Sequence, residues 1–108
     1  MDKRLINLLK LLQLKCGVLI GQKSLDRLIT FVDGYIYCTN EQENVHLNFL
    51  TGFQEYIEKY YDMHDNIHLF HNWSEIICFF NATEEEAFDA FYKHMNLFLK
   101  ETIFDVEE

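Results

Sequence analysis

The stretch over residues 24–37 limits the fold of this chain most strongly, because its apolar residues recur at the spacing of one helical face. The residues at i, i+3, i+4 and i+7 are Leu25, Leu28, Ile29 and Val32. Ser24 can cap such a helix, since its hydroxyl can accept a hydrogen bond from a backbone N–H one turn further on. We therefore predict an amphipathic helix over residues 24–37 that ends around Gly34 and Tyr35.

The remainder of the chain also favours helices, because it contains no proline and only four glycines among 108 residues. Apolar residues at helical spacing predict four more helices, over residues 2–14, 45–61, 72–80 and 84–101. Polar stretches at residues 39–44 and 62–72 predict surface loops. A capping box at Thr83 and Glu86 predicts the start of the last helix. Five helices in this order predict an all-α fold, a compact bundle in a single domain of residues 1–108.

Two short apolar segments keep an alternative fold open. Residues 16–21 (CGVLIG) lie between glycines and predict an extended connector or a lone buried strand. Residues 75–80 (EIICFF) have high β propensity, and Cys78 within them is expected to be a small buried hydrophobe. If both segments were strands, the result would be an α+β fold with short strands at residues 17–20 and 76–80.

The sequence also bounds the compartment. The apolar stretch of residues 5–14 is interrupted at helical intervals by Asn7, Lys10 and Gln13, and no small-residue cleavage site follows it, which favours a surface helix over a signal peptide. The sequence contains no run of 18 apolar residues, so it predicts no membrane span. Three scattered cysteines without a CxxC pair fit a reducing compartment. We therefore expect a cytoplasmic protein.

The net charge of −9 is distributed unevenly along the chain. Residues 1–30 hold six basic and two acidic residues, a balance of +4, whereas residues 31–108 hold three basic and sixteen acidic residues, a balance of −13. Such an acidic body would repel phosphates, which argues against nucleic acid as a partner. It favours a basic protein partner, because a negative surface steers such a partner inward.

No arrangement of residues predicts a reaction. His64, His68 and His71 follow an i, i+4, i+7 spacing that could bind zinc on a helix, but their turn-like surroundings favour a solvated connector. The three glutamates at residues 84–86 are explained by capping and by the helix dipole. We therefore expect a protein without a metal, a cofactor or enzymatic activity, and a metal-dependent enzyme built on the three histidines is the weakest alternative.

Two segments of the chain resemble the pattern of a group of small bacterial proteins. The pattern is R-P-x-M-Y-I-G followed by S-L-x-x-L-x-x-F-x-x-G-Y, and later a tryptophan segment followed by an acidic E-x-A-F-x-x-F-Y motif. The matching positions of the first segment are Ile20, Gly21, Ser24, Leu25, Leu28, Phe31, Gly34 and Tyr35. The second segment pairs Trp73, Ile76 and Ile77 with the acidic and aromatic stretch at residues 85–92. The chain departs from the pattern at Lys15 and Cys16, where Arg and Pro would stand, and at Leu19, where Tyr would stand. Members of the group resemble immunity proteins encoded beside secreted polymorphic toxins, which implies a protein partner.

These observations combine into one hypothesis, an acidic protein-binding module of the immunity type that neutralises a cognate toxin by occlusion. Tyr60 and Tyr61 cannot both face the core of one helix, so Tyr61 is taken as an aromatic contact. The candidate partner-binding residues are Asp33, Glu41, Glu43, Glu55, Glu58, Asp62, Asp65 and Tyr61. The alternative is a structural or regulatory helical protein that acts as a homodimer through an apolar patch.

Overall fold

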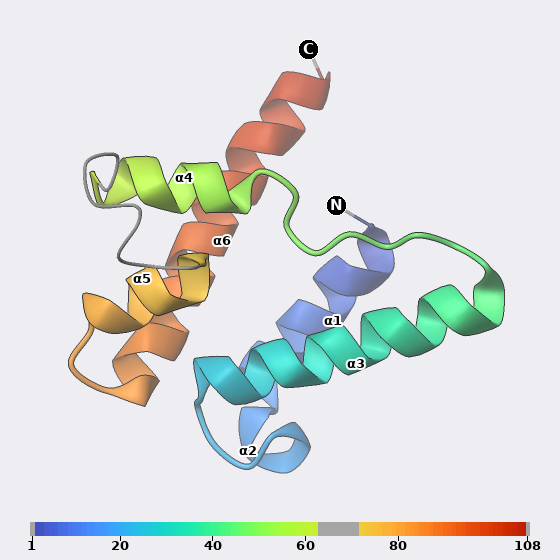
Figure 1. Ribbon diagram of the computed structural model, residues 1–108, viewed down its shortest axis with the longest axis horizontal. Helices are drawn as coiled ribbons and strands as arrows, with labels where there is room; N and C mark the ends of the chain where they lie inside the picture. The colour runs from blue at the N-terminus through green and yellow to red at the C-terminus, as the bar shows by residue number, and fades with distance from the viewer. Residues whose placement is uncertain (1, 63–71, 108) are drawn as a thin grey trace. The chain divides into compact units, whose positions relative to one another are not determined.

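The computed structural model describes residues 2–62 and 72–107, with side chains described for residues 2–62 and 72–100. The chain forms two compact units, Met1–Thr51 (unit 1) and Gly52–Glu108 (unit 2), which we describe in turn. The described residues contain six helices and no strand, so the predicted all-α class is confirmed and the α+β alternative is wrong (Figure 1). The predicted number of five helices is one short, because a short helix near Gly17 was not expected.

Unit 1 begins with α1 (Lys3–Leu14), which confirms the first predicted helix. Asp2 caps α1, because its Oδ1 accepts a hydrogen bond from the Arg4 backbone N–H at 2.7 Å. Three leucines at helical spacing bury one face of α1 completely: Leu5, Leu9 and Leu12. The interrupted apolar pattern is therefore that of an amphipathic helix, as predicted.

The extended connector or lone strand expected in residues 16–21 is wrong, as is the alternative strand at residues 17–20, because this segment is α2 (Cys16–Leu19) followed by a turn at Ile20. The Val18 and Leu19 amides donate to the Lys15 carbonyl, and the Ile20 amide donates to the Cys16 carbonyl. A lone strand would leave these backbone groups without partners, whereas a helical turn satisfies them locally. Val18 is 85% exposed, so the segment is not buried either.

The third helix, α3 (Leu25–Glu43), starts where predicted, with the Ser24 hydroxyl accepting from the Arg27 amide. Its end was predicted wrongly, because the helix passes through Gly34 and continues over the predicted loop at residues 39–44. A single glycine inside a helix destabilises the helix by only about 1 kcal/mol, which is too little to end it. The helix ends at Asn44 in the left-handed conformation, with φ of 52°, a geometry that asparagine tolerates well.

Unit 2 begins with α4 (Phe53–Tyr60), which is much shorter than the helix predicted over residues 45–61. Residues 45–52 form loop and turn structure instead. Two of them have left-handed backbone angles that interrupt a helix, Leu50 with φ of 53° and Gly52 with φ of 87°. Gly52 therefore precedes the helix rather than lying inside it, and the absence of a Cβ permits its conformation.

The remaining helices are α5 (Trp73–Phe79) and α6 (Glu84–Glu107). Asn72 caps α5 by accepting from the Glu75 amide at 3.0 Å, so the helix predicted over residues 72–80 is confirmed and the alternative strand at residues 76–80 is wrong. The capping box is confirmed at the start of α6, where Thr83 Oγ1 accepts from the Glu86 amide and Glu86 Oε2 accepts from the Ala82 amide. Cys78 is exposed, contrary to its expected burial, because the buried face of α5 is made by Ile76 and Ile77.

The core of unit 2 is aromatic. Phe53 of α4 is fully buried, and its ring centroid lies 4.9 Å from Trp73 of α5 and 5.3 Å from Phe98 of α6. Trp73 stacks on Phe91 of α6 at 5.3 Å. These contacts join α4, α5 and α6, so the C-terminal ends of α4 and α5 reach the same side of the unit (Figure 1).

Candidate protein-binding surface

The negative charge of the chain is concentrated in unit 2. Unit 1 holds six basic and five acidic residues, a balance of +1, and unit 2 holds three basic and thirteen acidic residues, a balance of −10. The two balances together make the net charge of −9. A partner recognised by charge would therefore be attracted mainly by unit 2.

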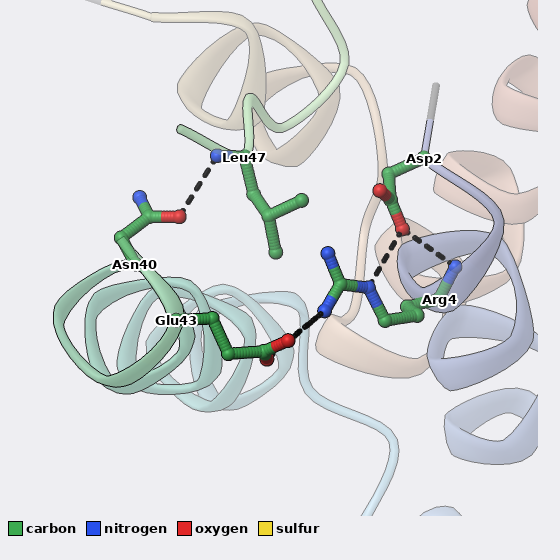
Figure 2. A network of polar contacts seen from close by, with 5 residues as sticks. All are labelled: Asp2, Arg4, Asn40, Glu43 and Leu47. Atoms are coloured by element: carbon green, nitrogen blue, oxygen red, sulfur yellow. Dashed lines mark hydrogen bonds and ion pairs between the residues drawn. The ribbon is translucent and has the colours of Figure 1, made fainter. Parts of the chain in front are cut away.

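The three candidate carboxylates of unit 1 lie on α3, and the structure gives them different surroundings. Asp33 and Glu41 are exposed and stand eight residues apart, which separates them by about 80° around the helix axis. Glu43, at the end of α3, is already paired, because Arg4 Nη1 of α1 lies 2.9 Å from both of its carboxylate oxygens (Figure 2). Glu43 therefore joins the ends of two helices rather than presenting an unbalanced charge.

The contact between Arg4 and Glu43 belongs to a small polar network (Figure 2). The Arg4 backbone amide, together with the Arg4 side chain at 3.3 Å, holds the pKa of the Asp2 carboxyl below its usual value. The hydrogen bond to Asp2 raises the pKa of Arg4 in turn, with the charge of Glu43 adding to the effect. On the same stretch of α3, Asn40 Oδ1 accepts from the Leu47 amide at 2.8 Å and secures the segment that follows the helix.

The candidate carboxylates of unit 2 lie on and after α4. Glu55 is exposed and lines, with Gly52, Tyr56, Lys59 and Tyr60, a surface hollow of about 430 Å³. Glu58 is half-buried and accepts a hydrogen bond from Gln54 Nε2 at 2.9 Å.

The last two candidate carboxylates follow the end of α4. Asp62 is exposed and has a left-handed backbone, with φ of 54°. Asp65 lies outside the described residues. Glu55 and Asp62 are thus the candidate carboxylates of unit 2 that the structure places at exposed positions.

Tyr61, the aromatic candidate, is half-buried and held by the protein itself. Its hydroxyl lies 2.8 Å from His94 Nε2 of α6, and its ring stacks on Phe80 at 4.6 Å with an interplanar angle of 12°. Burial, with the neighbouring Tyr60 adding to it, raises the pKa of the Tyr61 hydroxyl, although a hydrogen bond with Asn81 acts in the opposite direction. Of the two adjacent tyrosines, Tyr60 is the more accessible, with 52% of its surface exposed.

His94 is a residue that our sequence reasoning missed. It is only 2% exposed, its Nε2 meets Tyr61, and its Nδ1 is buried without a hydrogen-bond partner among the described residues. Burial, helped by the charge of Lys93, lowers the pKa of the imidazole below its ordinary value, so His94 is neutral at pH 7. The available signal was its spacing, because His94 lies three residues after Phe91 and directly before Met95 on the buried face of α6.

The described residues give no support to the other site types. No group of three His, Cys, Asp or Glu side chains within residues 2–62 and 72–100 is arranged to hold a metal ion, and His64, His68 and His71 lie outside the described residues. Within the part of the chain that the structure describes, no helix combines the length and the apolar character that a bilayer crossing requires.

Comparisons of the chain with protein-family models, with curated proteins and with solved structures found no match. The class of protein is therefore defined by the fold and charge alone. It is an all-α protein whose second unit is strongly acidic and carries exposed aromatic rings.

Proposed function

We propose that the protein is an acidic binding module of the immunity type, which neutralises a basic toxin in the cytoplasm by covering its surface. The observation that carries the proposal is the balance of −10 within unit 2. Four carboxylates of its α6 are exposed in addition to Glu55 and Asp62: Glu84, Glu85, Glu86 and Asp89. The resemblance to immunity proteins supports the same class of partner.

The proposed mechanism is electrostatic steering followed by occlusion. Exposed carboxylates accelerate the encounter with a positively charged surface and suppress wrong orientations. The bound module then blocks access to that surface, such as the active site of a nuclease, without performing chemistry. All eight candidate residues of the sequence analysis belong to this proposal, and the charge balance gives the greater weight to those of unit 2.

The test is co-purification with the product of the neighbouring gene, followed by calorimetric titration at 50 mM and 300 mM salt. We expect binding that weakens at the higher salt concentration, because exposed charges are screened. Glu55→Lys and Glu41→Lys change the net charge equally at exposed helical positions, one in each unit. A larger loss for Glu55→Lys would show that unit 2 makes the contact, and failure of any cognate toxin to bind would refute the proposal.

A further inference from the structure

Four aromatic rings form a continuous row at the C-terminal ends of α4 and α5. In order they are Tyr60, Tyr61, Phe80 and Phe79, and we call them the aromatic row. Consecutive ring centroids are separated by 4.9, 4.6 and 5.1 Å. The row therefore connects the C-terminal ends of α4 and α5 through rings that contact one another in turn, and it lies wholly within unit 2.

Most of this row is accessible to solvent. Phe79 is 65% exposed, Tyr60 52% and Phe80 46%, whereas Phe53 and Phe91 of the unit 2 core are fully buried. Single exposed apolar residues are ordinary, but contiguous exposed rings are typical of sites that contact another molecule. The row is thus a candidate contact surface distinct from the core.

Both tyrosines of the row are also held by contacts with buried His94. Tyr61 is fixed by its hydroxyl contact to His94 at 2.8 Å and by stacking on Phe80, and the Tyr60 ring meets the His94 ring edge-on at 4.3 Å. Rings that are ordered before binding lose little rotamer freedom when a partner arrives, so less of the interaction energy is spent on ordering them. Buried His94 thereby acts as a positioning residue for the surface.

The charge of unit 2 selects the chemistry of the partner. Aromatic faces attract cations, a guanidinium can stack on a ring while it pairs with a carboxylate, and unit 2 carries a balance of −10. A second copy of the chain would bring another unit with a balance of −10 against the row, which like-charge repulsion disfavours. We propose that the aromatic row docks an arginine-bearing segment of a basic protein, a proposal that rests on the proposed function for its class of partner.

The test compares two peptides of equal charge, hexa-arginine and hexa-lysine, titrated into the full chain and followed by NMR of the aromatic side chains. We expect hexa-arginine to bind more tightly and to shift the signals of the row. Phe79→Ser and Tyr60→Ser should each weaken its binding about two- to five-fold, the factor that an exposed cation–π contact corresponds to. Tyr37→Ser is the matched control, because Tyr37 is an aromatic residue of α3, 69% exposed and outside the row.

Equal affinity for the two peptides would overturn the proposal, because charge alone would then explain binding. An equal loss in Tyr37→Ser would overturn it as well. Sedimentation that shows a dimer in the native chain and a monomer in Phe79→Ser would assign the row to a second copy and also overturn it. The peptides do not require the toxin, so a toxin that fails to bind refutes the proposed function alone. A toxin that still binds Phe79→Ser with native affinity refutes only the role of the row.

Discussion

The contact between Tyr61 and His94 allows a prediction that distinguishes two effects on stability, the loss of a hydrogen bond and the burial of a polar group that has no partner. Tyr61→Phe removes the hydroxyl that lies 2.8 Å from His94 Nε2 and keeps the ring that stacks on Phe80. His94 Nδ1 already lacks a hydrogen-bond partner among the described residues. The substitution therefore leaves both nitrogens of the buried imidazole without a hydrogen bond to a described residue. We expect the free energy of unfolding to fall by about 1–3 kcal/mol, the cost of orphaning a buried polar group.

The paired substitution Tyr61→Phe with His94→Leu is the matched control. It removes both partners, and replacing both members of a buried hydrogen bond by apolar groups is close to neutral. We therefore expect the double variant to be more stable than Tyr61→Phe alone. Urea unfolding followed by the fluorescence of Trp73 measures this difference, because Trp73 is the only tryptophan and packs between Phe53 and Phe91 in the same unit.

The same histidine predicts a dependence of stability on pH. The pKa of His94 is lowered in the folded state, whereas the unfolded chain takes up its proton around the ordinary value of 6.5. Below that pH the unfolded state binds more protons than the folded state, so the contribution of His94 to stability is present above 6.5 and is lost progressively as the pH falls from 6.5 through the lowered pKa of the folded state. The imidazole contacts the rings of Tyr60 and Tyr61, and the charge of Lys93 also acts on it.

The native chain should therefore be less stable at pH 5.5 than at pH 7.5, and His94→Leu should reduce this difference. Two results would refute the reasoning. One is a free energy of unfolding of Tyr61→Phe that lies within about 0.3 kcal/mol of that of the native chain, since this is about the error of additivity for independent sites. The other is an unchanged pH dependence in His94→Leu.

Substitutions at four further positions test the fold. Gly34→Ala should stabilise α3 by about 1 kcal/mol, because an added Cβ meets nothing within 4 Å. Gly52→Ala should destabilise unit 2 by about 1–2 kcal/mol, because the φ of Gly52 is +87°. Circular dichroism during urea unfolding compares the two variants, and a stability change of the same sign in both would contradict the prediction. Phe53→Ala should lower the free energy of unfolding by about 3–5 kcal/mol, because it empties the centre of the unit 2 core, and Trp73 fluorescence would report a loss below 1 kcal/mol as a failure. Thr83→Ala should lower the melting temperature through a loss of about 1 kcal/mol at the start of α6, whereas Thr83→Ser should restore the native value.

The starts of α3, α5 and α6 were predictable from the sequence because their capping signals are local. Ser24, Asn72 and Thr83 each accept a hydrogen bond from an amide three residues on, a contact that depends on neighbouring residues alone. Helix ends were not predictable in the same way. Gly34 suggested an end that α3 passes by, and the true end depends on the left-handed conformation of Asn44, which leads into a segment secured by Asn40.

The candidate surface was also predictable only in part. The sequence indicated where carboxylates are abundant, and most of them are exposed because charged side chains seldom leave water without a partner. It did not show that Glu43 is paired with Arg4, 39 positions earlier, or that Tyr61 contacts His94, 33 positions later.

The helical class and the acidic character thus followed from the sequence by itself, because helical spacing and charge are properties of nearby residues and of composition. Only the tertiary structure decided which tyrosine is held by His94, and which rings form a continuous exposed row. The physical reason is that side-chain partners distant in sequence are selected by packing, which brings the ends of α4 and α5 to one side of α6.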